Sequence, residues 1–451
     1  MPWLLPILPP VARAAASVYY RIRYVGEPVP RTGPVLLVAN HPNSLLDPML
    51  VVATAGRPVR FLAKAPLFHD PKTAWLVKSA GAIPVYRRAD DPSQVEKNFD
   101  AFDAVYAELA RGAAVGIFPE GLSHSEPALG PLKTGAARMA LGAARLTGGA
   151  FPIVPVGLVL RRKDEFRSSA YVVTGAPVAW DDLAHRGVDD ADAVHALTDR
   201  IAAGLQAVTV NLAQWADQPL VECAVRIWEA EHTVAPTAAE RVARVERTTQ
   251  LLGQVRRTAD PEGTQLARDV DRFRRRLDRL RLRPADVGAE VGTRRAVGWA
   301  AGKLYLLAPF ALAVAWAGLV AFYVPYRLTG WIVGRVRLRP DERSTWKLLI
   351  GIGVYGMWVV AAAGVAGVAG AAGVIRGFLV AVVVLLGMPA IGMLGLGARE
   401  RWRGARDDAR RFLLLRSRRD LVAQLREERH GLGARLDMLL TRLTATQLPG
   451  T

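Results

Sequence analysis

The sequence has one cysteine, Cys223, in 451 residues. One cysteine cannot form an intrachain disulfide, so a small disulfide-stabilised fold is excluded and a reducing compartment fits. The histidines away from His41 also lack metal-ligand spacing, so we expect no metal and no bound cofactor. They are His69, His124, His185, His195, His232 and His430. The role of His124 stays open, because it lies beside a polar block around Glu120.

The amino-terminal segment lacks the basic residues that open a secretory signal peptide. Its sequence, "MPWLLPILPPVARAAASVYY", also places four prolines in the apolar run. Both features argue against a cleaved signal. We expect residues 1–25 to form an interfacial membrane anchor, with Trp3, Tyr19 and Tyr20 at the level of the lipid headgroups.

The first 235 residues lack net charge, because they hold 23 basic and 23 acidic side chains. The remainder holds 36 basic and 18 acidic side chains, so the whole excess of +18 lies there. Basic residues beside apolar runs are typical of the cytosolic flanks of membrane spans. Nucleic-acid binding is the competing interpretation, and no nucleic-acid motif supports it. We therefore expect a phospholipid membrane as a partner and no nucleic acid.

Three long runs in the carboxy-terminal half lack charged residues. Each exceeds the roughly 20 residues that cross a bilayer, and buried helices of a soluble protein are the alternative. Small-residue repeats such as "AGVAGVAGAAG" favour close packing between helices in lipid. The runs are Leu304–Tyr326, Leu348–Ile375 and Gly377–Ala398.

The loop 327–347 holds six basic and two acidic residues, and the tail after residue 398 is rich in arginine. The positive-inside rule places both in the cytoplasm, together with a cytoplasmic catalytic domain. We expect the last two runs to form a hairpin in the inner membrane that turns at Arg376. The first run is then re-entrant or in-plane, as Pro309 and Pro325 permit, and a spanning segment is the alternative.

The amino-terminal half alternates short apolar runs with segments of helix-forming composition, which predicts an α/β domain. The runs are nearly continuous, as expected for strands covered on both faces. The expected strands are 35–40, 59–63, 82–86, 113–119, 151–160 and 171–175. The expected helices are 45–56, 65–79, 94–111, 132–147 and 191–212.

These patterns predict a division into five segments. An interfacial anchor precedes the α/β domain, a basic helical region and a membrane region follow it, and a basic amphipathic helix ends the chain. That last helix fits membrane docking or self-association into a homo-oligomer, and a solvated charged helix is the alternative. The segments are 1–25, 26–235, 236–295, 296–398 and 399–451.

The stretch "NHPNSLLDP" places four polar side chains between a strand and a helix. His41 follows the strand, and Asn43 or Ser44 is a candidate cap for a helix beginning near Leu45. Asp47 falls in the first turn of that helix, where its carboxylate can hold His41 as a base. Ordinary turn and capping roles are the alternative for this stretch alone.

Further polar blocks follow later strands. Arg87 and Arg88 come after "GAIPVY" and suit a phosphate, with Arg88 the more solvated neighbour. Glu120 and Gly121 follow "GIFP", and Lys133 lies near the start of a helix. Helix starts favour anions, which adds a second phosphate-compatible feature.

Four ordered blocks resemble the glycerolipid acyltransferase family, which is defined by an H-x4-D motif. The blocks are Asn40–Pro48, Gly81–Arg87, Phe118–Gly121 and Val154–Leu158. The resemblance implies an acyltransferase domain with a mixed sheet flanked by helices, followed by a helical segment and transmembrane helices. It implies acyl transfer from acyl-CoA or acyl-carrier protein to a glycerol-phosphate acceptor.

The resemblance also implies roles. His41 removes the proton of the acceptor hydroxyl and Asp47 orients it. Arg87 holds the acceptor phosphate. Acceptor-pocket roles fall to Glu120 and Gly121, and extra phosphate contacts to Lys64 and Lys133, for which a surface lysine is the alternative.

The spacing departs from the family pattern, because five residues separate His41 from Asp47. "HPNSLLDP" is similar to "HANQFVDP" of the yeast-type glycerol-3-phosphate acyltransferase branch, which favours glycerol-3-phosphate over lysophosphatidate as acceptor. Pro84 also stands where many members carry Phe. Acylation of another polar lipid, a hydrolase, and a non-catalytic lipid-binding protein on the same scaffold are the alternatives. Ser44 and Ser123 lack the G-x-S-x-G turn of a serine hydrolase.

Overall fold

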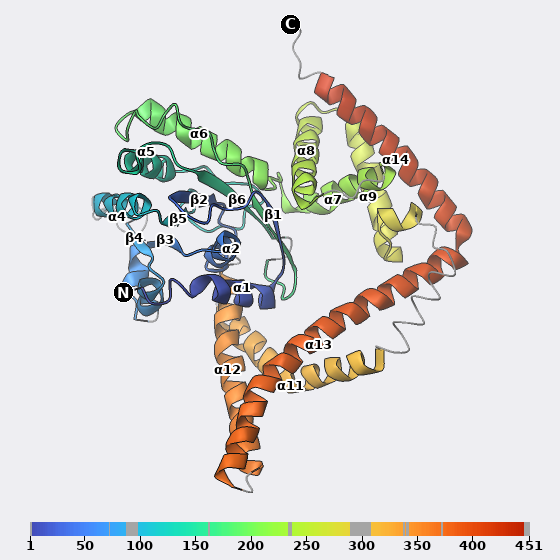
Figure 1. The fold of residues 1–451 in the computed structure, drawn as a ribbon. Helices are drawn as coiled ribbons and strands as arrows, with labels where there is room; N and C mark the ends of the chain where they lie inside the picture. Colours follow the sequence, from blue (N-terminus) through green and yellow to red (C-terminus); the bar gives the residue numbers. More distant parts are fainter. Residues whose placement is uncertain are drawn as a thin grey trace. The chain divides into compact units, whose positions relative to one another are not determined.

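The computed structural model describes residues 2–71, 73–86, 98–160, 163–232, 237–288, 308–336, 339, 342–370 and 373–445. Two compact units account for the chain (Figure 1). Unit 1 comprises Met1–Gln218, Pro236–Gly253 and Arg339–Thr345. Unit 2 comprises Pro219–Ala235, Gln254–Leu338 and Trp346–Thr451. Each unit therefore collects segments that are distant in the sequence.

Unit 1 is built on a seven-stranded mixed sheet in the order β1-β7-β6-β2-β5-β3-β4. The strands β2 to β6 run parallel to one another, β7 is antiparallel to β6, and β1 is parallel to β7. Their carboxyl ends therefore meet at one edge of the sheet. The bounds are β1 Arg21–Gly26, β2 Val35–Ala39, β3 Val59–Lys64, β4 Ile83–Val85, β5 Ala114–Ile117, β6 Ile153–Leu160 and β7 Ser169–Thr174.

Helices cover both faces of this sheet, which explains the continuous apolar strands. Every residue of β2 is buried. Leu36 and Val38 belong to the core cluster that the sheet shares with α4, α5 and α6, while α2 contacts β3, β6 and β7 and packs against α1. The helices are α1 Leu8–Tyr19, α2 Leu46–Ala55, α3 Ala74–Ser79, α4 Asn98–Ala110, α5 Gly135–Thr147 and α6 Ala191–Val208, with the 3-10 turns Ala65–Phe68 and Trp215–Asp217.

The six predicted strands are confirmed, as are the helices predicted at 45–56, 132–147 and 191–212, and β1 is the strand that was missed. The helix predicted at 65–79 is a 3-10 turn followed by α3, and residues 94–97 of the helix predicted at 94–111 lie outside the described residues. It is the edge strand beyond β7, and its run "RIRYVG" alternates with arginines, so it lacks an apolar signal. The headgroup position predicted for Tyr19 and Tyr20 is wrong, because these side chains are 3% and 1% exposed. Trp3 is 63% exposed, and the anchor role of residues 1–25 stays a prediction.

Unit 2 has a helical core of its own. Ile227 of α7, Phe273 of α9 and Leu425 of α14 lie in one buried cluster. The predicted break at "DPEG" is confirmed, because Asp260 accepts the backbone N–H of Gly263 and caps α9. The helices of this unit are α7 Gln218–Glu231, α9 Pro261–Leu280 and α14 Arg419–Ala445, with the 3-10 turn Pro284–Gly288. Most of α8 Ala238–Arg257 belongs to unit 1.

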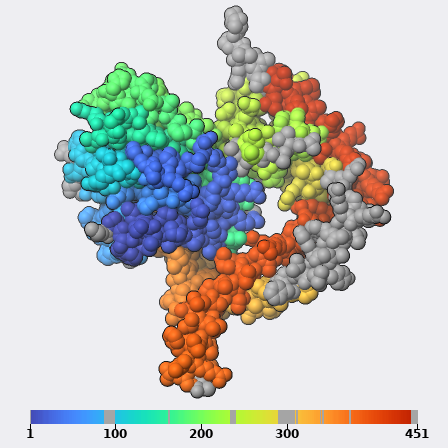
Figure 2. Space-filling view, viewed as in Figure 1, coloured from blue at the N-terminus to red at the C-terminus, as the bar shows by residue number. Residues whose placement is uncertain are grey.

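Three described helices are long and apolar enough to cross a membrane. They are α11 Ala308–Arg335, α12 Arg343–Ala369 and α13 Val374–Ser417. Large apolar side chains are exposed along all three (orange in Figure 2). Such exposure suits lipid, because a soluble protein buries surfaces of this kind. These helices indicate membrane association.

Glycines mediate close contacts between these helices, as the small-residue repeats predict. In α11, Gly318 faces Gly395 of α13 so closely that an added Cβ would lie 3.4 Å from the other Cα. A Cβ on Gly367 of α12 would lie 3.0 Å from the carbonyl oxygen of Gly377. Backbones that approach this closely gain van der Waals contact that lipid cannot replace.

Two sequence boundaries in this region are wrong. The turn between α12 and α13 precedes Val374, so Arg376 lies inside α13 rather than at the turn. The tail is also two helices rather than one, because α13 continues to Ser417 and α14 begins at Arg419. Arginine-rich sequence supports helix as well as apolar sequence does, so the charge boundary at residue 398 does not end α13.

Gly157 of β6 tests how tightly α6 packs on the sheet. A Cβ here would lie 1.9 Å from the carbonyl oxygen of Val208, so Gly157→Ala must displace backbone. We expect the free energy of unfolding to fall by about 1–3 kcal/mol, measured by denaturant unfolding in detergent. Gly135→Ala is the control, because no atom lies within 4 Å of an added Cβ there. It should be neutral or stabilise by about 0.5–1 kcal/mol, and equal losses in both variants would contradict the packing.

Candidate active site

The carboxyl ends of the parallel strands gather the predicted polar residues at one edge of the sheet. His41 follows β2, and Glu120 follows β5. Lys64 is the last residue of β3, and Lys163 lies beyond the end of β6. The topology thus brings together residues that are up to 122 positions apart, counted from His41 to Lys163.

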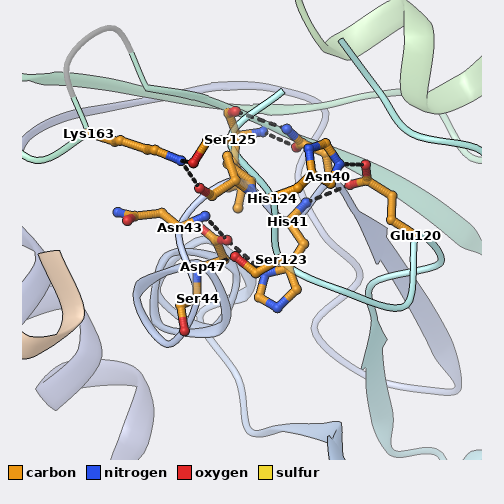
Figure 3. Close-up of polar contacts among 12 residues, drawn as sticks. Asn40, His41, Asn43, Ser44, Asp47, Glu120, Ser123, His124, Ser125 and Lys163 are labelled. Atoms are coloured by element: carbon orange, nitrogen blue, oxygen red, sulfur yellow. Dashed lines mark hydrogen bonds and ion pairs between the residues drawn. The ribbon is translucent and has the colours of Figure 1, made fainter. Parts of the chain in front are cut away.

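His41 and Asp47 form a close pair (Figure 3). Nδ1 of His41 lies 2.8 Å from Oδ2 of Asp47. The same carboxylate oxygen accepts the backbone N–H of Asn43 at 2.6 Å. A carboxylate that accepts two hydrogen bonds assigns the imidazole proton to Nδ1, which leaves Nε2 as the basic nitrogen. The arrangement is that of a general base held by a carboxylate.

Asp47 is fully buried, and its environment contains opposing electrostatic effects. Burial raises the pKa of the Asp47 carboxyl, while His41, the Asn43 N–H and the charge of Lys163 act in the opposite direction. Its other oxygen, Oδ1, is buried and makes no hydrogen bond within the described part of the chain. The described hydrogen bonds to the carboxylate are therefore all made through Oδ2.

The imidazole plane of His41 is set by stacking. The ring of Phe118 lies 4.0 Å from it at an interplanar angle of 10°, and Phe61 stacks in turn on Phe118. The backbone is held as well, because the His41 N–H donates to Oε1 of Glu120 at 2.8 Å and the His41 carbonyl accepts the His124 N–H at 3.1 Å. Position and orientation of the base are thus fixed from separate strands.

Glu120 is buried, and its two oxygens hold the loop after β5 against His41. Oε2 accepts the backbone N–H of Gly130 at 2.8 Å and also bonds Nε2 of His124. The Nδ1 atom of His124 accepts the N–H of Glu126 at 3.2 Å, so the proton of the neutral ring is on Nε2. The role of His124 is therefore structural, because it holds the loop after β5 in place through Glu120.

The capping roles expected for Asn43 and Ser44 are wrong. The residue before α2 is Leu45, whose apolar side chain makes no cap hydrogen bond. Asn43 instead donates from Nδ2 to the hydroxyl of Tyr20 at 2.6 Å. The backbone N–H of Ser44 donates to Oγ of Ser123 at 3.0 Å. Partners that are distant in the sequence hold the turn, so Asn43 and Ser44 form tertiary hydrogen bonds rather than caps.

The remaining predicted residues lie around this pair without a direct contact to it. Gly121 has φ +78°, and the Lys133 side chain lies against it, with Cε 3.0 Å from an added Cβ. Lys64 and Lys133 are both exposed at the strand ends. Arg87, with Arg88, lies outside the described residues. Among the described residues no group of three or more His, Cys, Asp and Glu side chains is placed to hold a metal.

Residues 21–159 match the family model "Acyltransferase". These residues contain β1 to β5, most of β6, and the complete His41 and Glu120 loops. The matched segment is therefore similar to the acyltransferase family. It holds all the residues described above around His41 except Tyr20, which precedes it, and those in segments after β6.

The same part of the chain is similar to curated proteins. Glycerol-3-phosphate O-acyltransferase 2 of Saccharomyces cerevisiae is 31% identical over 193 residues, which cover 42% of this chain and 26% of the relative. Glycerol-3-phosphate O-acyltransferase 1 of the same organism is 28% identical over 284 residues, covering 57% and 36%. The chain thus spans about a quarter to a third of these relatives.

Two further similarities involve lysophosphatidate enzymes. A chloroplastic 1-acyl-sn-glycerol-3-phosphate acyltransferase of Brassica napus is 32% identical over 126 residues, covering 28% of this chain and 33% of the relative. The crystal structure of the 1-acyl-sn-glycerophosphate acyltransferase PlsC from Thermotoga maritima is 18% identical, covers 45% of this chain and 77% of that one, and has a TM-score of 0.33. That score is too low to support an inference.

Residues outside the predicted blocks complete the site. Tyr20, Ser125 and Lys163 bond to the His41 turn or to the Glu120 loop. The sequence signal for them is weak, because "VYYR" and "RRKDEF" resemble ordinary strand flanks. Proximity to a strand end at the functional edge was the available clue for Lys163.

Asp47→Asn tests the electrostatics of the acyltransferase domain. Burial raises the pKa of Asp47 above its ordinary value of 3.8, so the ionised form destabilises the folded state at neutral pH relative to a neutral group. We expect the Asn variant to have a higher free energy of unfolding at pH 7, with the gain shrinking as pH falls through the raised pKa. Thermal unfolding between pH 5 and pH 8, values chosen to bracket neutrality, measures this.

Asp190→Asn is the matched control with the opposite sign. The backbone N–H of Ala193 and the charge of Arg186 hold the pKa of the exposed Asp190 carboxyl below 3.8. Its stabilising effect is present above that value and disappears as pH falls through the lowered pKa. The control variant should therefore lose stability at pH 7. An Asp47→Asn protein that also loses stability at pH 7 would contradict the assigned burial effect.

Proposed function

We propose that the protein is a glycerolipid acyltransferase that transfers a fatty acyl group to glycerol-3-phosphate or lysophosphatidate. The observation that carries the proposal is the 2.8 Å pair of His41 and Asp47 at the functional edge of an acyltransferase domain. The names of the curated relatives support the acceptor class. The donor is acyl-CoA or acyl-carrier protein.

The chemistry needs one base and an activated ester. Nε2 of His41 takes the proton of the acceptor hydroxyl, and the oxygen attacks the thioester carbonyl carbon. The carbon–sulfur bond then breaks, the ester remains on the acceptor, and the imidazolium returns its proton to the departing thiolate. Asp47 stabilises the imidazolium formed in this step. Because the thioester is already activated, positioning and one base suffice without a covalent enzyme intermediate.

Cationic residues at neighbouring strand ends supply the expected phosphate contacts. Lys64 ends β3, two strands from the His41 turn, and Lys133 lies over Gly121 beside Glu120. Arg87, which comes after β4 in the sequence, is the third residue proposed for the phosphate. A phosphate held along this side of the edge presents an attached hydroxyl toward His41. Lysine and arginine both pair with phosphate, and arginine does so through two hydrogen bonds.

Two observations support the proposed membrane topology. Residues Arg339–Thr345 belong to unit 1, so α12 starts on the side of the membrane that holds the acyltransferase domain. The positive-inside rule favours the same side for the arginine-rich tail and for both flanks of α11, which carry Arg294, Arg295 and Lys303 before the helix and the basic loop 327–347 after it. Both ends of α11 then lie on one side, while α12 and α13 cross as a hairpin.

Contacts of α11 fit an in-plane position. Gly318 and Phe322, in its middle, lie against Gly395 and Gly392, close to the last apolar residue of the α13 run. A helix that spanned beside α13 would meet the hairpin at its far end too. The basic flanks place this shared side in the cytoplasm of a cell whose inner membrane holds the hairpin.

An activity assay with purified protein tests the function. We expect thiol release from palmitoyl-CoA to depend on glycerol-3-phosphate or lysophosphatidate and to yield the acylated acceptor. His41→Ala should lower turnover by roughly 10²–10⁴-fold, because general-base catalysis contributes about that factor. His195→Ala, an exposed position on α6, is the matched control and should keep wild-type turnover.

The pattern of acceptors decides among the alternatives. Preference for glycerol-3-phosphate would support the five-residue spacing as an acceptor signal, whereas preference for lysophosphatidate would reject that signal and keep the mechanism. Release without any acceptor would identify a thioesterase. Absence of release with both acyl-CoA and acyl-carrier protein would reject catalysis altogether.

Cysteine labelling tests the hairpin. The native Cys223 is buried, so Val374→Cys and Ser417→Cys place reactive thiols at exposed positions at opposite ends of α13. A membrane-impermeant maleimide should label Val374→Cys in right-side-out vesicles and Ser417→Cys in inverted vesicles. Labelling of both from the same side would show that α13 does not cross.

A further inference from the structure

Lys163 joins the two loops that carry the site. Its Nζ donates to the carbonyl oxygen of Pro42 at 2.6 Å and to Oγ of Ser125 at 2.7 Å (Figure 3). Pro42 is the residue after His41, and Ser125 is the residue after His124. One side chain therefore links the turn that presents the base to the loop that holds the base's backbone.

The backbone of Lys163 is anchored from two other segments. Its carbonyl oxygen accepts the hydroxyl of Tyr20 and, at 2.6 Å, the hydroxyl of Ser344. The Tyr20 hydroxyl in turn accepts from Asn43, inside the His41 turn. Tyr20, Asn43 and Ser344 are at most 1% exposed. Such buried networks hold a fixed geometry, because breaking one bond leaves a buried polar group unsatisfied.

The far end of this network is fixed as well. Ser125 offers its backbone carbonyl to Nε1 of Trp215 at 2.7 Å, just after α6. Ser44 bonds to Ser123 across the same two loops. The lysine thus bridges two anchored segments. Its ammonium group cannot move away from the His41 turn unless several of these hydrogen bonds break.

Lys163 also places a positive charge near the His41–Asp47 pair. His41 and Lys163 act on the Asp47 carboxyl, and Asp47 in turn acts on Tyr20. Glu120 faces the His41 backbone from the loop after β5 and is bonded to His124, and both are unchanged in the variants below. Burial raises the pKa of Tyr20, so its hydroxyl is neutral at physiological pH. The lysine then supplies the positive charge that opposes the effect of burial on Asp47. A cation beside a carboxylate–imidazole pair favours the state in which the pair carries a net negative charge.

We infer that Lys163 is a positioning residue of the acyl transfer, which holds the Pro42 carbonyl and keeps the His41–Asp47 pair in its basic state. This role rests on the proposed function. It assigns chemistry to a side chain that touches neither substrate nor the reacting atoms and acts through the His41 turn. The four sequence blocks that define the domain do not include it.

Two consequences separate this role from a purely structural one. Loss of the charge lets the pair take up a proton at higher pH, so the acidic limb of the kcat/KM profile moves to higher pH, by about one unit for a nearby charge. Loss of the hydrogen bonds lets the base shift, and a small displacement of a catalytic group lowers kcat by roughly tenfold to hundredfold. KM for the acceptor stays unchanged, because the lysine does not bind it.

Three substitutions of the full-length protein divide charge from hydrogen bonding. Lys163→Met removes both, Lys163→Gln keeps an N–H donor without charge, and Lys163→Arg keeps both. We expect the acidic limb to move in the Met and Gln variants and to stay in place in the Arg variant. Lys78→Met is the control, because this exposed lysine lies in α3 and has no contact in the network.

A readout that does not need turnover keeps the inference separate from the proposed function. The His41 side chain is 18% exposed, so diethyl pyrocarbonate can modify it, and mass spectrometry of the His41 peptide follows the rate. The midpoint of this rate against pH should move upward in Lys163→Met and Lys163→Gln. This shift is expected even if no acyl acceptor is ever found.

The outcomes are distinct. Absence of acyl transfer by the wild-type protein would reject the proposed function. The pH midpoints of His41 modification would still test the role of Lys163. Active wild-type protein with superimposable pH profiles and midpoints in the Met and Gln variants would overturn the role of Lys163. If Lys163→Met fails to fold, shown by loss of its cooperative thermal transition, the Gln and Arg variants carry the comparison. A shift in Gln that is absent in Arg would then establish the role.

Discussion

The hydrogen bond between a fully buried carboxylate and an imidazole organises unit 1. Burying the Asp47 charge is unfavourable, so nearby groups must stabilise it. His41 and the Asn43 N–H form hydrogen bonds with the carboxylate, and the charge of Lys163 acts on it as well. Phe118 and Glu120, from a neighbouring strand, then hold the ring and backbone of the histidine. The parallel sheet makes this possible, because it delivers all these segments to one edge.

Sequence alone predicted the features that depend on local pattern. The continuous apolar run of β2, the histidine at its end and the carboxylate in the first turn of α2 all follow from spacing. The features it missed depend on partners far along the chain. Tyr20 meets Lys163 across 143 residues, and Ser344 meets it across 181, so no window of sequence contains both partners. The edge strand β1 was missed because its arginines interrupt the apolar signal.

The capping error at Asn43 and Ser44 has the same origin. Both residues are frequent at helix starts, and that preference is a local average. Here α2 begins later, after Leu45, and both residues lie in the turn before it, where the Asn43 amide donates to Tyr20 and the Ser44 backbone N–H donates to Ser123. The membrane half shows the reverse case. Its helices were predictable from composition, whereas the end of α13 was not, since arginine-rich and apolar sequences are both helical.

Gly121 has a consequence for the neighbouring lysine. With no side chain at that position, the aliphatic stem of Lys133 lies along the backbone, its Cε within 3.0 Å of the place a Cβ would occupy. A free lysine loses up to about 2 kcal/mol of rotational entropy when its ammonium is immobilised. Here part of that freedom is already removed by the fold. The phosphate contact proposed for Lys133 would then cost less rotational entropy, because the missing side chain at Gly121 lets the lysine stem lie against the backbone.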